Sequence, residues 1–217
     1  MPTYTDTISG VREEAMTLSR RQVMVGAAAL GLALPLGAAR AEEPFWATGD
    51  MAMGAEDAPV TVIEYASMTC PHCAAFHHGT WPKLKENWID TGKVRFVFRE
   101  FPFDRAGLAA AMLARCGGED RFFAFIDVLF TQQDKWTRTE DPIAELKRIG
   151  GLGGVSPQQF DRCLASEELQ DMILQSRLTG HEDFGVNGTP TLIINGEKHE
   201  GGNDYDSVAA ALDDLTS

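Results

Sequence analysis

Basic residues and long apolar runs are both scarce in this sequence, and each shortage excludes a class of protein. Lysine and arginine number 19 against 32 aspartates and glutamates, which gives a formal net charge of −13. A nucleic-acid-binding protein presents lysine and arginine clustered on one face, and this acidic chain has no such cluster, so no nucleic-acid partner is expected. The second half has no apolar run long enough to span a membrane, which predicts a soluble body.

The chain length limits the number of domains. Its 217 residues suffice for one domain with a full core, or for one domain that carries a sizeable insertion. Two independent domains would be a tight fit, and no internal repeat is visible.

The N-terminus has the pattern of an export signal. Ser19-Arg20-Arg21 precedes an apolar run from Val23 to Ala38, and a small-x-small cleavage pattern ends at Ala41. Residues 1–41 are therefore predicted to be a signal peptide, cleaved after about Ala41. The paired arginines favour the twin-arginine route, with the general secretory route and a buried helix as alternatives. Export predicts a periplasmic protein, in which disulfides persist and four cysteines can form two pairs.

The first part of the mature chain indicates a strand-helix-strand unit. Residues 42–58 mix acids, glycine and methionine without a period and are expected to be a lead-in with little regular structure. Val60–Ala66 is predicted to be a strand, with Glu64 on a face that is otherwise apolar. A helix over 70–90 and a strand over 94–98 follow, so the two strands should pair in parallel.

The remainder predicts helices and then a return to strands. Residues 105–184 show helical periodicity interrupted by glycine and proline, with the aromatic residues from 122 to 130 in the core. A strand at 191–194, the Asn195-Gly196 turn and a strand at 197–200 predict a hairpin before a terminal helix. The fold class is therefore α/β.

The stretch SMTCPHCAAFH, residues 67–77, contains two of the four cysteines. A Cys-x-x-Cys pair either binds a metal or carries out dithiol chemistry. A zinc site usually needs four protein ligands, but Cys116 and Cys163 are single and widely spaced. His77, one turn after Cys73, is a possible third ligand. Metal binding stays the weaker alternative.

Dithiol chemistry has a better physical basis in this stretch. Cys70 stands where a helix begins, with Pro71 in the first turn, so unpaired N–H groups and the helix dipole favour its thiolate. His72 is expected to stabilise that thiolate further if it donates toward the Cys70 sulfur. Cys73, one turn inside the helix, should be shielded.

These motifs resemble one family. A strand carrying Glu64, the Cys-Pro-His-Cys motif, a helical insertion and Gly188-Thr189-Pro190 before a strand are similar to exported dithiol oxidases of the DsbA family, including BdbD-like proteins. The resemblance implies a thioredoxin fold with an inserted helical subdomain. The thioredoxin-like core would comprise residues 59–104 and 185–217, and the insertion residues 105–184.

The resemblance also implies roles for residues outside the cysteine motif. Pro190 would be a cis-proline facing the cysteine pair, with Thr189 binding an extended client peptide; without the resemblance, Pro190 would be an ordinary proline at a strand start. Glu64 would lie beneath the disulfide and exchange a proton with Cys73. The alternative for Glu64 is a solvent-facing strand acid.

The other cysteines and histidines have simpler interpretations. Cys116 and Cys163 lie on apolar helical faces, and in an exported protein a structural disulfide is favoured over two buried free thiols. His77 and His78 are expected to be polar points on a helix surface, outside the site.

The expected function is thiol:disulfide exchange at Cys70 and Cys73, as a dithiol oxidase that introduces disulfides into folding exported proteins. The redox-active disulfide would serve in place of a cofactor. The resemblance implies reoxidation by a quinone-linked membrane partner. Residues 42–58 are too few for a dimerisation domain, so a monomer is expected. A reductase or isomerase is the nearest alternative, and a non-catalytic metal-binding domain is the alternative of another class.

Overall fold

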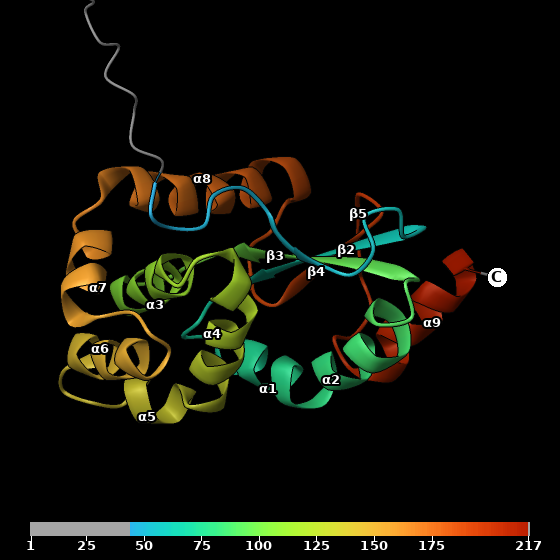
Figure 1. The fold of residues 1–217 in the computed structure, drawn as a ribbon. Coiled ribbons are helices and arrows are strands. Elements are labelled where there is room, and N and C mark those ends of the chain that lie inside the picture. The colour runs from blue at the N-terminus through green and yellow to red at the C-terminus, as the bar shows by residue number, and fades with distance from the viewer. Residues whose placement is uncertain (1–43, 217) are drawn as a thin grey trace, which may run out of the picture. The chain divides into compact units, whose positions relative to one another are not determined.

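A computed structural model describes residues 44–216, so the expected signal peptide lies outside the described residues. At its centre is a five-stranded sheet with the strand order β1-β3-β2-β4-β5 (Figure 1). The strands are β1 (Met51–Met53), β2 (Val60–Ala66), β3 (Val94–Glu100), β4 (Thr191–Ile194) and β5 (Glu197–Lys198). β2 and β3 pair in parallel, as expected, and the other neighbours pair antiparallel.

The connection between β2 and β3 consists of three short helices rather than one. They are α1 (Pro71–Gly79), α2 (Trp81–Leu84) and the π-helix η1 (Lys85–Ile89). Pro82 lies in the first turn of α2 and has no backbone N–H to donate to the preceding turn. The single helix predicted over 70–90 is therefore interrupted near Thr80.

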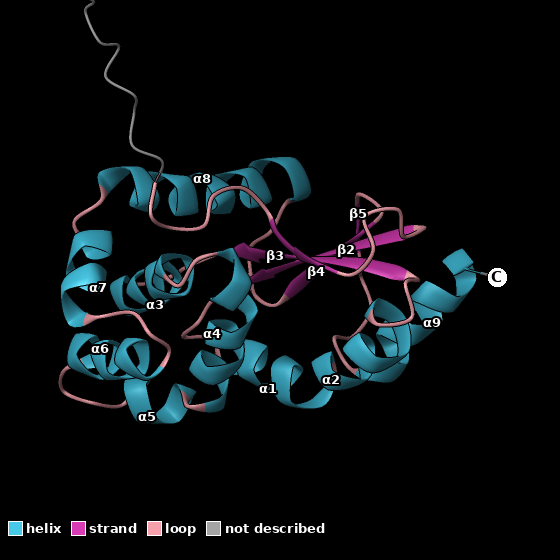
Figure 2. Cartoon of the chain, in the orientation of Figure 1, coloured by secondary structure: helices cyan, strands magenta, loops and turns pink. Residues whose placement is uncertain are grey.

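Six helices lie between β3 and β4, over residues 105–184 (Figure 2). They are α3 (Arg105–Cys116), α4 (Glu119–Thr131), α5 (Gln133–Thr137), α6 (Pro142–Leu152), α7 (Pro157–Leu164) and α8 (Glu167–Phe184). Four of them begin at a side chain that accepts a hydrogen bond from the backbone N–H three residues later, which satisfies a donor at the helix start. These N-cap residues are Asp104, Asp141, Ser156 and Ser166. The last helix of the chain is α9 (Tyr205–Thr216).

The lead-in segment differs from the prediction of little regular structure. It contains β1, which pairs antiparallel with β3 so that Met51 lies opposite Phe98 and Met53 opposite Phe96. A segment of three residues is too short to show the alternating pattern of a strand in the sequence. It forms a strand because its backbone pairs with that of β3. At the other edge, β5 ends at Lys198, two residues before the predicted end.

The sheet has two buried faces of unequal size. Residues 60, 62, 64 and 66 of β2 face the main core, as their period of two predicted, and α4 contributes buried aromatic residues to the same core. The opposite face carries a smaller cluster in which Tyr65 and Ile193 pack against Phe101 and Val186. Glu64 therefore points into the main core.

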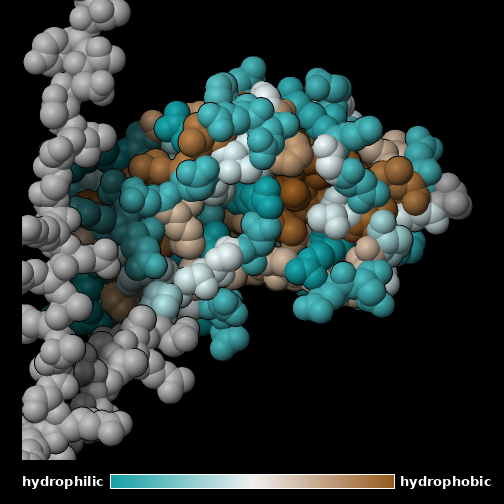
Figure 3. Space-filling model, turned by 90° about the horizontal axis from the view of Figure 1, so that it is seen from above, coloured by the Kyte–Doolittle hydropathy of each residue, from teal (hydrophilic) through white to brown (hydrophobic). Residues whose placement is uncertain are grey.

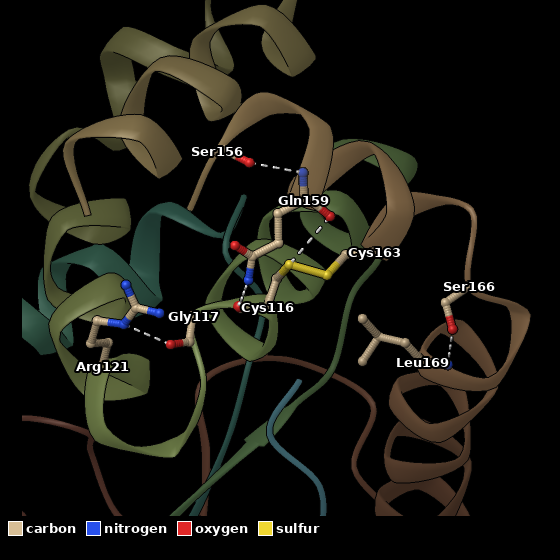
Figure 4. The surroundings of a disulfide bond; sticks show 8 residues. All are labelled: Cys116, Gly117, Arg121, Ser156, Gln159, Cys163, Ser166 and Leu169. Atoms are coloured by element: carbon tan, nitrogen blue, oxygen red, sulfur yellow. Dashed lines mark hydrogen bonds between the residues drawn. A yellow bond between two sulfur atoms is a disulfide. The ribbon is translucent and has the colours of Figure 1, made fainter. Parts of the chain in front are cut away.

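A disulfide joins Cys116 at the end of α3 to Cys163 in α7 (Figure 4). The two Cα atoms are 6.2 Å apart, and 47 positions separate the cysteines in sequence. Closing a loop of this length stabilises the folded chain by about 4 kcal/mol in the chain-entropy model. Beside the disulfide, the Gln159 side chain donates a hydrogen bond to the Cys116 carbonyl, with N and O 3.1 Å apart. The predicted pairing is observed.

One face of the described part is mostly polar. On the face seen from above, hydrophilic residues cover most of the visible surface, and a hydrophobic patch is exposed near its middle (Figure 3). None of the helices over residues 44–216 combines the length and the apolar character needed to cross a bilayer.

Candidate active site

Cys70 lies at the N-cap of α1, as the sequence predicted. Its backbone is extended, with φ −79° and ψ 120°, and Pro71 occupies the first helical position. The residue is 9% exposed, whereas Cys73, one turn further along the helix, is 0% exposed. Both are free thiols. A client molecule can therefore reach the first sulfur and not the second.

The two thiols differ strongly in acidity. A hydrogen bond from the Cys73 thiol lowers the pKa of Cys70 to about 5; burial opposes this, and the Thr189 side chain and the backbone N–H groups of Cys73 and His72 lower it further. The pKa of Cys73 is raised, first by burial and then by its hydrogen bond to Cys70 and the negative charge of Glu64. At pH 7 Cys70 is therefore mainly a thiolate, and Cys73 keeps its proton.

His72 lowers the pKa of Cys70 through its backbone, whereas the sequence predicted a contribution from its ring. The side chain is exposed on α1, and the contribution to the pKa of Cys70 comes from the His72 backbone N–H. Among the hydrogen bonds of residues 44–216, none joins the imidazole to the Cys70 sulfur.

The segment before β4 lies directly against Cys70. The Thr189–Pro190 peptide bond is cis, as the resemblance implied. When it is protonated, the Cys70 thiol donates a hydrogen bond to the Thr189 carbonyl, with S and O 3.2 Å apart. Asn203, in the loop before α9, holds this segment by donating from its side chain to the Pro190 carbonyl at 3.0 Å.

Gln133 fixes the loop before Cys70 from the inserted helices, a role that the sequence did not indicate. It lies in α5 and is 7% exposed. Its side-chain nitrogen donates to the carbonyls of Met68 and Cys70 at 2.8 and 2.9 Å. These bonds satisfy two acceptors beside the reactive sulfur, so the helical insertion positions the site. A lone glutamine in a helical segment gives no sequence signal for such a contact.

Glu64 and His77 form a buried pair beneath the cysteines. Glu64 is 0% exposed, which rules out the solvent-facing alternative, and His77 is 5% exposed. The His77 Nε2 atom lies 3.1 Å from Glu64 Oε2, and the ring stacks on Phe130 with centroids 4.3 Å apart. The expectation of a surface residue is therefore wrong for His77, whereas His78 is exposed. The spacing of four residues from Cys73, which places both on one helix face, was the available signal.

Two grooves lie beside the segment that contains the cis-proline. One, of about 560 Å³, is lined by His72 and Phe76 of α1 together with Thr189 and Pro190. The other, of about 550 Å³, reaches Asn187 and is lined by apolar and basic side chains, among them Phe103, Arg177 and His181. The two grooves therefore lie along the segment that precedes β4.

Metal-binding residues are not gathered at this site. Over residues 44–216, no three side chains of His, Cys, Asp or Glu are placed together so that they could hold a metal ion. His77, the possible third ligand, is hydrogen-bonded to Glu64 instead.

Comparisons with known proteins place this geometry in a family. The thioredoxin family profile matches residues 47–214. A putative protein-disulfide oxidoreductase of Rickettsia bellii is 38% identical over 165 residues, which cover 76% of this chain and 63% of that protein. The probable disulfide bond formation protein D of Bacillus cereus is 30% identical over 181 residues, 80% of this chain and 82% of that protein. The crystal structure of Wolbachia pipientis α-DsbA1 matches with a TM-score of 0.71 at 33% identity, covering 77% of this chain and 91% of that one.

The chain belongs to the DsbA-type disulfide oxidoreductases. The thioredoxin fold expected for this family is the observed fold, and oxidised BdbD from Bacillus subtilis shares it at 22% identity with a TM-score of 0.70. The chain spans 63% of the length of the Rickettsia bellii relative and 59% of that of Rickettsia felis.

Proposed function

We propose that this member of the DsbA family is a dithiol oxidase, which introduces disulfides into exported proteins by exchange at Cys70 and Cys73. The observation that supports it most is the low pKa of Cys70, lowered to about 5 by the Cys73 thiol and the neighbouring backbone. A thiolate this stable is a good leaving group, and it stabilises the reduced enzyme relative to its disulfide. Such an enzyme passes its disulfide on to clients.

The proposed reaction has two exchange steps. A client thiolate attacks the Cys70 sulfur of the enzyme disulfide; the Cys70–Cys73 bond breaks, a mixed disulfide forms, and Cys73 leaves as a thiolate that takes a proton from Glu64. A second client thiolate then attacks the client sulfur of the mixed disulfide and releases Cys70 as a thiolate. The client is oxidised by two electrons and the enzyme is reduced by two.

The surroundings of the site support a peptide client. Thr189 and Pro190 present backbone groups beside Cys70, and the grooves on either side offer apolar surface to client side chains. Main-chain hydrogen bonds to an extended segment would bind many sequences, and the grooves would add preferences.

The setting we propose is the periplasm, with the enzyme acting as a monomer. The disulfide between Cys116 and Cys163 suits an oxidising compartment, as does the predicted signal peptide. Reoxidation would come from a quinone-linked membrane protein, since each turnover leaves Cys70 and Cys73 reduced and the chain needs an external oxidant.

Equilibration with a series of glutathione redox buffers separates an oxidase from a reductase. We expect a reduction potential above the about −180 mV of protein disulfide isomerase, because the Cys70 thiolate stabilises the reduced form. DsbA itself has a potential of about −120 mV, a property measured for that enzyme and not a value obtained for this chain. A potential near the about −270 mV of thioredoxin would contradict the oxidase proposal.

The stability of the reduced form should depend on pH. Since folding lowers the pKa of Cys70 from its ordinary value of 9.0 to about 5, the thiolate stabilises the folded reduced protein fully above about pH 9. This contribution decreases as the pH falls and is absent below about pH 5. On acidification, the Tm of the reduced protein should therefore fall relative to the Tm of the oxidised protein. Thermal unfolding of both forms over a pH series measures this.

Thiolate absorbance at 240 nm gives a direct test of the same titration. A step with its midpoint near pH 5 is expected in the wild type and should be missing in Cys70→Ser. Thr189→Val removes a side chain that lowers the pKa of Cys70, so its midpoint should be higher. A wild-type midpoint near 9 would show that the site does not stabilise the thiolate.

A further inference from the structure

We propose that His77 is a positioning residue that takes up a proton from solvent each time Glu64 gives its proton to Cys73, so that the buried pair stays electrically neutral. The inference rests on the exchange chemistry proposed for Cys70 and Cys73, and it assigns His77 a role through Glu64 rather than on the reacting sulfur. It is carried by the geometry of the pair and by a groove that reaches the imidazole.

In each side chain of the Glu64–His77 pair, one polar atom is hydrogen-bonded to the partner and the other has no hydrogen bond. Glu64 Oε2 lies 3.1 Å from His77 Nε2. The other two atoms, Glu64 Oε1 and His77 Nδ1, are buried and have no hydrogen-bond partner among the described groups. An unpartnered buried polar atom is costly, so each needs a function or a further ligand. A neutral carboxyl with its proton on Oε1 can accept at Oε2 from the Nε2–H of a neutral imidazole.

The Glu64 side chain has no direct access to solvent. It lies on β2 between β3 and β4 and is 0% exposed. When it gives the Oε1 proton to the Cys73 thiolate, a carboxylate remains in the core. An unpaired buried charge of this kind is strongly destabilised, so proton transfer requires a compensating positive charge nearby.

His77 can supply that charge because its buried side chain lines a groove that leads to solvent. A groove of about 380 Å³ between η1 and α4 is lined by His77, Trp81 and Phe123, with Lys85 and Asp127 also on its wall. This is not the face of α1 that meets the cis-proline segment, because His72 and Phe76 line that groove. Protons and client peptides would therefore use different faces of one helix.

The charged and titratable groups around His77 are few. Glu64 faces it from β2, Cys73 lies one turn away on α1, and Lys85 and Asp127 lie across the groove. Lys85 is paired with Asp90, with N and O 2.6 Å apart. The remaining ring contacts are aromatic, with Phe130 stacked on the imidazole. Of these groups, the Glu64 carboxylate is hydrogen-bonded to the ring and is the natural counter-ion of an imidazolium.

The protons balance in both directions. During client oxidation the Glu64 proton moves to the Cys73 sulfur, and a solvent proton binds to Nδ1 of His77, which leaves an imidazolium paired with a carboxylate. During reoxidation Cys73 returns its proton to Oε1 and Nδ1 releases its proton to solvent. No electrons pass through the histidine.

Histidine ring NMR of the unmodified protein at pH 7 tests this directly. In the oxidised form, His77 should be neutral with its proton on Nε2; in the reduced form, both ring nitrogens should be protonated. His78, the exposed neighbour, should not change and serves as an internal control. The same His77 protonation state in both redox forms would overturn the proposal.

A double-mutant cycle tests the link to Glu64. His77→Gln keeps an N–H donor for the carboxylate but cannot bind the proton, so the rate at which a cysteine peptide attacks the oxidised protein should fall about tenfold or more at pH 7. Glu64→Gln should have a similar effect, and adding His77→Gln to it should cause no further loss, because one residue acts through the other. His78→Gln should stay within about twofold of the wild type.

Two outcomes would contradict the role of His77 without touching the oxidase proposal. One is a His77→Gln rate within twofold of the wild type. The other is an undiminished effect of His77→Gln in the Glu64→Gln background, which would indicate a packing role. The glutathione equilibrium of the wild type judges the oxidase proposal separately, because it depends on Cys70 and not on the proton route.

Discussion

Cys70→Ala is expected to abolish peptide oxidation, with a loss of at least about a thousandfold, because the thiolate that forms the mixed disulfide is gone. The Cys73 thiol cannot replace it. It is 0% exposed, and burial together with the nearby Glu64 charge raises its pKa. The measurement is the oxidation rate of a two-cysteine peptide under a fixed glutathione ratio.

Cys73→Ser keeps the reactive Cys70 and should trap a client as a stable mixed disulfide. The Cys70 thiolate of this variant attacks an activated peptide disulfide, the activating thiol leaves, and the mixed disulfide persists because no neighbouring thiol resolves it. Serine keeps a hydroxyl donor for Cys70, so this variant should react faster at pH 6 than Cys73→Ala. Mass spectrometry of the adduct gives the readout.

The matched control for both variants removes the other disulfide. Cys116→Ala combined with Cys163→Ala leaves Cys70 and Cys73 in place and should retain exchange below its lowered Tm. Peptide oxidation by Cys70→Ala, or an absence of adduct in Cys73→Ser, would contradict the assigned roles.

Arg115→Met should strongly destabilise the folded protein. Arg115 and Glu100 are 3% and 1% exposed, and two of the arginine nitrogens bond the carboxylate, one of them at 2.8 Å. Arg115 also donates to the backbone carbonyl of Gly49 and so holds the lead-in segment against α3. Removing the arginine leaves a buried carboxylate without a partner, which costs about 3–5 kcal/mol in the free energy of unfolding.

Urea unfolding of three variants tests whether the unpaired Glu100 carboxylate causes the loss of stability. The same substitution at an exposed pair, Arg138→Met beside Asp134, should change stability little, since exposed ion pairs contribute little. Adding Glu100→Gln to Arg115→Met should cost less than the sum of the single changes, because it removes the stranded charge. Additive losses, or a loss for Arg115→Met below about 1 kcal/mol, would contradict this account.

Local sequence patterns predicted most of the fold. The period of two in Val60–Ala66 identified the strand and its core face, and the Asn-Gly turn identified the hairpin, because both signals depend on neighbours in sequence. Pro71 and the cysteine before it marked the start of α1. These local signals are sufficient to place the cysteine motif at a helix N-terminus.

The contacts that complete the site had no local signal. β1 is a strand because β3 lies beside it, Gln133 reaches the Cys70 loop from 63 positions away, and His77 faces Glu64 across 13. The surface position expected for His77 was wrong for the same reason. A helix has a buried and an exposed side, and the packing of α4 against α1 decides which is which (Figure 1).

The sequence by itself determined which atoms can react: a Cys-x-x-Cys pair at a helix start gives one sulfur near unpaired N–H groups and one within the helix, whatever surrounds them. Only the tertiary structure decided how different the two sulfurs are and where protons can travel. Desolvation, the Thr189 segment and the Glu64–His77 pair all arise from chain segments that meet only on folding. Electrostatic effects depend on distance and burial, and neither is encoded in spacing along the chain.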